Sequence, residues 1–211
     1  DSIAEANANV TSIKGVITEK TQELDKLTQN YHRSKSRLES LVNITERYDG
    51  YGNSIRKIME LKDSTPGILG VIADIIKVEK QYETAIETAL GGTIQNIVTD
   101  KENTAKELIN YLKVNKLGRA TFLPLNAIHS RNTLENDNCI NEKGVVGVAS
   151  NLVRVSFEYE GLAKYLLGRI LVVDNIENAL VIARKYKYSL RIVTLEGEQL
   201  NPGGCFAGGG F

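Results

Sequence analysis

A glycine-rich stretch near one end of this 211-residue sequence holds the residues best suited to binding chemistry. Glycine fills five of the eight positions from Gly203 to Gly210, directly after Asn201 and Pro202. Glycine is needed where φ is positive or where another backbone must approach closely. Such a run can cradle a phosphate with backbone N–H groups, or it can lie against a second protein chain.

The neighbouring residues favour the second of these two readings. A phosphate loop needs Lys-Ser/Thr after its last glycine, or Gly-x-Gly-x-x-Gly at the start of a helix, and neither pattern occurs. On composition alone, an unstructured tail competes with a protein contact. Asn201-Pro202-Gly203-Gly204 is, however, typical of a defined turn. The sequence therefore predicts a protein contact at five glycines: Gly203, Gly204, Gly208, Gly209 and Gly210.

The titratable residues form no recognisable catalytic set. No Walker motif, Rossmann fingerprint or metal-ligand spacing occurs, so we expect no catalytic residues, no cofactor and no metal in this part of the protein. Asp100 and Asp174 precede expected helices and are interpreted as N-caps. Cys139 and Cys205 fit no disulfide framework, which favours a reducing compartment.

The charges balance, with 26 Lys and Arg against 26 Asp and Glu. General attraction to DNA or to a membrane is therefore not expected, and no apolar run is long enough to span a bilayer. Two local basic clusters lie where helices are expected to end, and the helix dipole favours cations there. The alternative is weak contact with DNA phosphates. The candidate DNA contacts are Lys113, Lys116 and Arg119 in one cluster, and Arg184, Lys185 and Lys187, with Arg191 close by, in the other.

Residues 1–48 carry a heptad repeat that predicts a coiled-coil arm. Its a positions are all apolar: Ile3, Val10, Ile17, Leu24, Tyr31 and Leu38. Its d positions are weaker, since Lys20 and Ser34 are polar. One apolar seam needs a partner, which is either a second copy of the arm or a returning helix beyond Phe211.

The rest of the chain repeats itself. Residues 70–78 match residues 147–155 at an offset of 77 positions, and the pattern continues with small deletions. Each copy predicts a short first segment, then a helix, a buried strand, a second helix and a final strand. The helices are expected at 79–90 and 102–115, then at 159–167 and 176–187; the strands at 93–98 and 120–123, then at 170–173 and 191–195. This organisation predicts four parts: an arm at 1–48, subdomains at 49–125 and 144–211, and a polar linker at 126–143.

Several segments together resemble one family, the hinge domain of the structural maintenance of chromosomes (SMC) proteins. The resemblance runs in order along the chain and is carried by residues 48–56, 70–76, 85–92, 118–125 and 201–210. Their sequences are YDGYGNSIR, GVIADII, AIETALGG, GRATFLPL and NPGGCFAGGG. The heptad arm stands where this family has its long coiled coil.

The resemblance implies a mixed α+β hinge of prokaryotic type and a non-catalytic role. Two hinges would join as a two-fold, ring-shaped homodimer, with the glycine run at or beside the interface. The arm would pair antiparallel with a helix of the same chain. The complete protein would carry an ATPase head, bind accessory subunits, and act on chromosome condensation and segregation in the cytoplasm, at the nucleoid. The alternatives are a DNA-binding module and, less favoured, a nucleotide-binding enzyme.

Overall fold

The structure, a computed structural model, describes residues 1–129 and 132–209. The chain divides into two compact units, Asp1–Gly50 and Tyr51–Phe211, and each is described by itself. The first unit is a single helix followed by a turn. The second contains every strand of the described residues.

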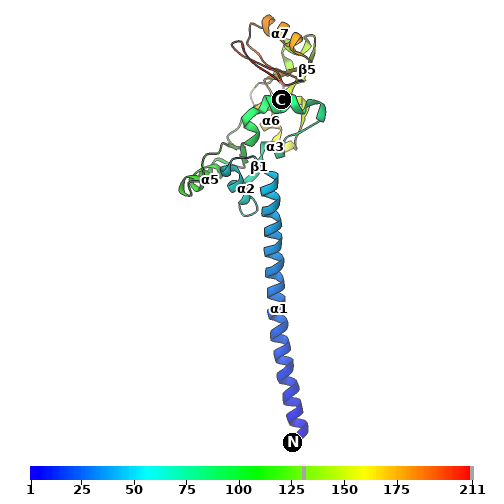
Figure 1. Cartoon of the computed structure of the whole chain (residues 1–211), viewed down its shortest axis with the longest axis vertical. Helices are drawn as coiled ribbons and strands as arrows, with labels where there is room; N and C mark the ends of the chain where they lie inside the picture. Colours follow the sequence, from blue (N-terminus) through cyan, green and yellow to red (C-terminus); the bar gives the residue numbers. More distant parts are fainter. Residues whose placement is uncertain (130–131, 210–211) are drawn as a thin grey trace. The chain divides into compact units, whose positions relative to one another are not determined.

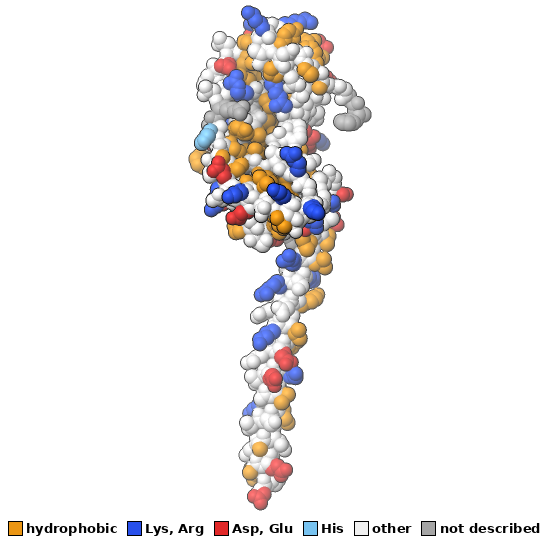
Figure 2. Space-filling model, turned by 90° about the vertical axis from the view of Figure 1, so that its left-hand side faces the viewer, with side chains coloured by type: hydrophobic (Ala, Val, Ile, Leu, Met, Phe, Trp, Pro, Cys, Tyr) orange, Lys and Arg blue, Asp and Glu red, His pale blue; other side chains and the backbone are white. Residues whose placement is uncertain are grey.

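Helix α1 (Ser2–Arg47) runs through the predicted arm. Its 46 residues correspond to a length of about 70 Å at 1.5 Å per residue. The a-position side chains of the heptad are exposed, with Ile3 at 78%, Leu24 at 62% and Leu38 at 62%. Figure 2 shows apolar side chains following one side of the arm. The predicted long helix is confirmed, and its apolar seam is left open to solvent.

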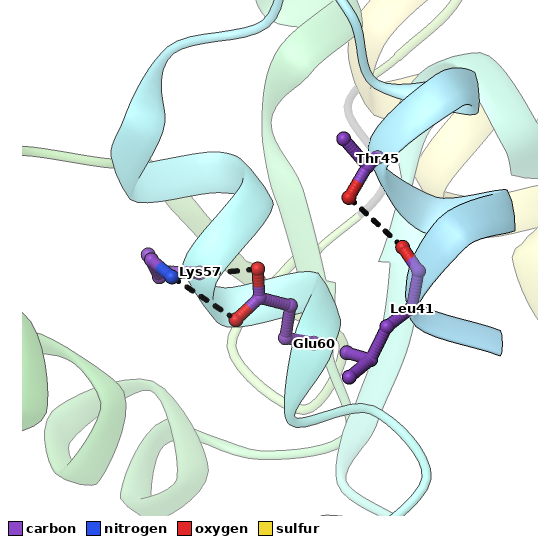
Figure 3. A network of polar contacts seen from close by, with 4 residues as sticks. All are labelled: Leu41, Thr45, Lys57 and Glu60. Carbon is purple, nitrogen blue, oxygen red and sulfur yellow. Dashed lines mark hydrogen bonds and ion pairs between the residues drawn. The ribbon is translucent and has the colours of Figure 1, made fainter. Parts of the chain in front are cut away.

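Threonine hydroxyls bind back to the helix along α1. Thr45 Oγ1, for example, donates to the carbonyl of Leu41 at 2.9 Å (Figure 3). On the globular unit, Lys57 of α2 (Asn53–Glu60) pairs with Glu60 one turn later, at 3.3 Å (Figure 3). Both are local surface contacts of a kind that contributes little to stability.

The globular unit is built from two copies of one small α/β unit (Figure 1). The first copy comprises β1 (Ile68–Val71), α3 (Ile72–Ile75), β2 (Lys77–Val78), η1 (Lys80–Tyr82), α4 (Glu83–Leu90), η2 (Gly91–Gln95), β3 (Ile97–Thr99), α5 (Glu102–Val114) and β4 (Phe122–Pro124). The second comprises β5 (Val145–Val148), η5 (Ala149–Leu152), β6 (Val153–Arg154), η6 (Phe157–Tyr159), α6 (Glu160–Leu167), β7 (Ile170–Val173), α7 (Ile176–Lys185) and β8 (Arg191–Thr194). Strands β9 (Gln199–Asn201) and β10 (Cys205–Ala207) follow the second copy, and no described strand takes their place after β4.

Strand pairing confirms the internal repeat. In the first copy β1 pairs antiparallel with β3, and β3 pairs parallel with β4. In the second copy β5 pairs antiparallel with β7, and β7 pairs parallel with β8. Even the irregularity in register recurs, between Ile68 and Gly70 and, 77 positions later, between Val145 and Gly147. The larger sheet continues through β9 to β10, so its order is β10-β9-β8-β7-β5.

A two-stranded ladder relates the two copies. Strands β2 and β6 pair antiparallel, with Lys77 opposite Arg154. These two residues are 77 positions apart, so each is the other's counterpart in the repeat. A pseudo-two-fold axis therefore passes through this pair, and the ladder is its symmetric junction.

One hydrophobic core joins the copies. It combines Ile86 of α4 and Val98 of β3 with Leu162 of α6 and Val172 of β7, all at most 2% exposed. A second cluster lies on the other face of the larger sheet, where α7 packs. Two residues of the predicted linker, Leu134 and Cys139, are buried in this second cluster, each 1% exposed. Burial also raises the pKa of the Cys139 thiol, which leaves it an inert core side chain.

Residues 126–143 are thus more structured than a polar loop. They contain the short helical turns η3 (Leu134–Asn136) and η4 (Asn138–Asn141), and the backbone N–H of Leu134 donates to the carbonyl of Gly168 at 2.9 Å. The sequence pattern missed this because the two apolar anchors are separated by polar residues. The strand expected at 93–98 is also shorter: it begins at Ile97, because Gly91 leaves α4 with φ +52° and a helical turn follows.

The predicted N-cap roles of Asp100 and Asp174 are wrong. The N-cap residues are Lys101 and Asn175, one position later. Asp100 accepts hydrogen bonds from the Lys101 N–H and the Thr104 hydroxyl, and the latter is the main reason that its pKa is lowered. Asp174 is bound in the same way by Asn175 and Asn178.

A pair of equivalent glycines makes room for these carboxylates. A Cβ on Gly67 would lie 2.7 Å from Asp100 Oδ1, and one on Gly144 would lie 2.5 Å from Asp174 Oδ1. The two glycines are 77 positions apart. Each carbonyl also accepts the N–H of its aspartate, at 3.0 and 2.8 Å. Asp100 therefore fastens the segment before β1 to the start of α5. Asp174 does the same between the segment before β5 and the start of α7.

Candidate dimerisation interface

The first glycines of the run form the turn between β9 and β10. The N–H of Gly204 donates to the carbonyl of Asn201 at 3.1 Å, with Pro202 and Gly203 between them. Proline fixes the first central position, and Gly203, with φ +87°, supplies the positive φ required at the second. The defined turn predicted from the sequence is confirmed, and β9 and β10 form an antiparallel hairpin.

The turn is tied to the end of α7. The Gly203 N–H donates to the carbonyl of Tyr188 at 2.9 Å. Lys187 and Tyr188 both have φ of 55°, an uncommon conformation for residues other than glycine. The Tyr188 ring also lies 6.2 Å, between centroids, from that of Phe206 on β10. A strained helix end and an aromatic pair therefore hold the hairpin in place.

The space beside the turn is open within the protomer. A Cβ at Gly203 or Gly209 would meet nothing within 4 Å, and one at Gly204 would only touch Tyr188 at 4.0 Å. Glycine is favoured here because φ is positive: +87° at Gly203, +88° at Gly204 and +132° at Gly209. Gly208 differs, because a Cβ there would lie 3.1 Å from Glu198 Cγ. Gly210 lies outside the described residues.

Strands β10 and β4 each end a sheet in the described part of the chain, as β5 and β1 do on the opposite sides of the same two sheets. Strand β10 ends the five-stranded sheet, and its three residues are exposed, with Phe206 at 49%. Strand β4 ends the three-stranded sheet. Its counterpart in the repeat, β8, is covered by β9. Strand β4 therefore has an open edge on the side where its counterpart β8 pairs with β9.

Side chains from β8 and β9 cap the end of α4. Arg191 Nη2 donates to the carbonyl of Ala89 at 2.8 Å, and Gln199 Nε2 donates to that of Thr88 at 3.1 Å. Burial of the guanidinium lowers the pKa of Arg191. The sequence groups Arg191 with a surface basic cluster, and this interpretation is wrong, because the side chain is half-buried between the copies. No sequence pattern marks this contact, since it joins residues 102 positions apart.

The basic clusters predicted to contact DNA lie apart. Lys113, Lys116 and Arg119 are exposed at the end of α5, whereas Arg184, Lys185 and Lys187 are exposed at the end of α7. Figure 1 places these helices in different parts of the globular unit. Lys185 is also bound by Glu142 at 2.5 Å, which raises the pKa of Lys185 and lowers that of Glu142. The DNA contacts stay a prediction, and the fold does not merge them into one surface.

The described residues also lack two features that would indicate other classes of function. No helix within residues 1–129 and 132–209 is both long and apolar enough to cross a membrane. Over the same ranges, His, Cys, Asp and Glu form no group of three or more suited to hold a metal ion.

A family model described as the flexible hinge domain of SMC proteins matches residues 65–183, which is more than half of the chain. This chain belongs to the SMC hinge family. The resemblance inferred from the sequence is therefore confirmed. Because the matched family is a hinge domain, this part of the protein is a non-catalytic module.

Relatives and solved structures agree with the family assignment. The chromosome partition protein Smc of Clostridium kluyveri is 37% identical over 98% of this chain, and that of Bacillus subtilis is 37% identical over 86%. This chain spans only 18% and 15% of those relatives. A crystal structure of an asymmetric dimer of the Geobacillus stearothermophilus SMC hinge domain is 39% identical in sequence and has a TM-score of 0.75. The match covers 87% of this chain and 76% of the chain in that structure.

A second solved structure includes a coiled-coil segment. The Pyrococcus furiosus Smc hinge domain with an extended coiled coil is 33% identical in sequence and has a TM-score of 0.64. The match covers 97% of this chain and 72% of the chain in that structure. The predicted fold class, an α+β hinge preceded by a long helix, is confirmed by these likenesses and by α1.

Proposed function

We propose that this chain is the dimerisation hinge of an SMC protein and that it joins two copies of that protein. The observation that carries the proposal is the pair of open strand edges, β4 and β10. At each contact, β10 of one protomer would pair with β4 of its partner, as β9 pairs with β8 within the chain. Two-fold symmetry makes this contact twice and closes a ring. The pairing also removes two exposed edges that would otherwise promote aggregation.

The glycine run fits the proposed contact. Gly203, Gly204 and Gly209 leave open space beside β10, so a partner backbone could approach without meeting a side chain. Gly208, and Gly210 beyond the described residues, would belong to the same interface. The apolar pair of Tyr188 and Phe206 would lie near its rim.

We further propose the role of the remaining parts. The arm at 1–48 would pair antiparallel with a returning helix that follows the hinge, which would cover its exposed seam. The boundaries 49–125, 126–143 and 144–211 stand as proposed subdomains and linker, although the linker packs into the second core. The complete protein would act in chromosome condensation and segregation with an ATPase head and accessory subunits, at the nucleoid of the cytoplasm.

The experiment is sedimentation equilibrium on the full chain, with variants that separate the hinge edge from the arm. Phe206→Lys places a charge on the exposed face of β10, which should weaken a dimer made through that edge. Val181→Lys is the matched control, because Val181 is an exposed apolar residue on α7, at 61%. Leu24→Lys combined with Leu38→Lys disrupts the arm seam instead.

We expect Phe206→Lys to raise the dimer dissociation constant at least tenfold, while Val181→Lys and the arm variant keep the wild-type value. A dimer lost only in the arm variant would refute hinge dimerisation and assign association to the heptads. A wild-type chain that stays monomeric at millimolar concentration would refute both dimerisation through the hinge and association through the heptads.

The runner-up function, DNA binding, is tested by charge reversal. Lys113→Glu with Lys116→Glu changes one cluster, and Lys187→Glu changes the other. If these cations contact phosphates, each variant should weaken binding and reduce the salt dependence of the binding constant. An unchanged salt slope would refute the proposed contacts without affecting the dimer proposal.

A further inference from the structure

The outer edge of β4 presents the main-chain groups of Phe122. On the inner side, toward β3, the Thr121 carbonyl accepts a hydrogen bond and the Leu125 N–H donates one, both at 2.9 Å. The N–H and C=O groups of successive residues alternate between the two sides of a strand. Phe122 and Pro124 therefore face the outer edge of β4, which no described strand covers.

Pro124 offers nothing to a strand that would pair at this edge. Proline has no N–H, and the Pro124 carbonyl already accepts the N–H groups of Ala127 and Ile128, at 3.1 and 3.2 Å. Pro124 lies opposite the last residue of β3 as Thr194 lies opposite the last residue of β7, so the two are counterparts. Thr194, by contrast, donates its N–H to the carbonyl of Glu198 at 2.9 Å. Proline within sheets is confined to such edge positions, and it ends the usable edge of β4.

The outer edge of β10 presents the main-chain groups of Phe206. The hydrogen bond from Thr194 to Glu198 makes these residues a bonded pair, and such pairs recur every two residues. Leu200 therefore turns its main-chain groups toward Ile192 of β8. The residues on either side of Leu200 face β10 instead, so Phe206, which lies opposite Leu200, faces away from β9.

The glycine turn limits the β10 edge as Pro124 limits the β4 edge. Gly204 is the next residue that could face outward, but its N–H donates to the Asn201 carbonyl at 3.1 Å. Two shifted alignments therefore lose bonds: Phe206 opposite Pro124 meets no donor and no available acceptor, and Phe122 opposite Gly204 leaves the Phe122 carbonyl without a donor. When Phe206 lies opposite Phe122, both exchange two hydrogen bonds, and the two deficient residues face each other.

We propose that β10 pairs antiparallel with the partner's β4 in this one register, with Phe206 opposite the partner's Phe122. The proposal rests on the proposed dimerisation and adds the residue pairs at the contact. The two phenylalanine side chains lie on the same face of the joined sheet, so the aromatic pair of Tyr188 and Phe206 continues across the contact. Main-chain groups left unpaired at a buried contact disfavour both shifted registers.

The native Cys205 makes the register measurable by cross-linking. It is exposed, whereas Cys139 is buried. In the proposed register Cys205 and the partner's Leu123 form a non-hydrogen-bonded pair, with Cα atoms about 4.5 Å apart, which a disulfide can bridge. The two shifted registers would place Thr121 or Leu125 opposite Cys205 instead. The full-length variants Leu123→Cys, Thr121→Cys and Leu125→Cys are oxidised with diamide, and Leu123→Cys combined with Cys205→Ser is the control.

Amide hydrogen exchange in the wild type tests the same register without a substitution. The amides of Phe122 and Phe206 should exchange at least tenfold more slowly above the dimer dissociation constant than below it, because each gains a hydrogen bond to the partner. The amides of Leu123 and Cys205 are the internal controls. They face β3 and β9 within the protomer, so their exchange should change little on dimerisation.

We expect Leu123→Cys to form a covalent dimer at least tenfold faster than Thr121→Cys or Leu125→Cys, and the control to form none. A dimer in sedimentation equilibrium that cross-links fastest at Thr121 or Leu125 would overturn the register and leave hinge dimerisation standing. A wild-type dimer in which the amides of Phe122 and Phe206 are not slowed would do the same. A chain that sediments as a monomer at millimolar concentration would overturn both the register and the proposed function.

Discussion

Replacing Gly203 with alanine separates the strain in the β9–β10 turn from contact with a partner chain. Gly203 has φ +87°, and an alanine at positive φ costs about 1 kcal/mol or somewhat more. Because the added Cβ meets nothing within 4 Å, no steric term adds to that cost within the protomer. The free energy of unfolding of the monomer should therefore fall by only about 1 kcal/mol.

The dimer dissociation constant responds differently. Backbone strain is present in both the folded monomer and the dimer, so it cancels from the association equilibrium. A rise in the dissociation constant then reports only what the new methyl group meets in the partner. If a partner backbone lies against the turn, we expect at least a tenfold rise, which corresponds to about 1.4 kcal/mol.

Gly50→Ala provides the matched control. Gly50 has φ +91°, and a Cβ there also meets nothing within 4 Å, but the residue lies at the end of the arm. Urea unfolding gives the stability change and sedimentation equilibrium gives the dissociation constant. If Gly203→Ala and Gly50→Ala shift both quantities equally, the glycine turn is not at the interface and the reasoning is refuted.

Three further predictions concern stability within the protomer. Arg191→Ala should lower the free energy of unfolding in urea by about 1–3 kcal/mol, because it leaves the carbonyl of Ala89 without its charged donor. Arg184→Ala is the control, and a loss of stability no larger than in that variant would contradict the role of Arg191 in joining the copies. Lys116→Gly should raise the thermal midpoint and add about 1 kcal/mol of stability, because Lys116 has φ 53°, and an unchanged midpoint would show that this conformation costs nothing. The pKa of Glu142 is lowered by the hydrogen bond from Lys185, so its contribution should be present above the ordinary value of 4.5 and be lost as the pH falls through the lowered pKa. Unfolding measured from about pH 6 to pH 3 should therefore show a smaller loss in Glu142→Gln than in the wild type, and parallel curves would refute the linkage.

Local patterns in the sequence were sufficient for much of the fold. The heptad gives α1 because an apolar residue every seven positions can only face one side of a helix. Apolar runs such as Ile170–Val173 give buried strands, and the offset of 77 residues gives two copies of one unit. The turn at Gly203 follows from proline and glycine, whose allowed φ values are set by covalent structure.

Contacts between distant residues were not accessible in the same way. The carboxylates of Asp100 and Asp174 could cap a helix or bind elsewhere, and the choice depends on Gly67 and Gly144, which lie more than 25 positions earlier. Leu134 and Cys139 sit in a polar segment, and they are buried because the second sheet presents an apolar face to them. Nothing local distinguishes such anchors from ordinary loop residues.

The sequence by itself determined the long helix, the duplicated α/β unit, the glycine turn and the family to which they belong, because these depend on periodicity and on the φ preferences of single residues. Only the tertiary structure decided that Arg191 joins the two copies, that Lys185 is paired with Glu142, and that β4 and β10 each end a sheet. The physical reason is that burial, strand order and pairing are properties of surfaces that meet only after the chain has folded.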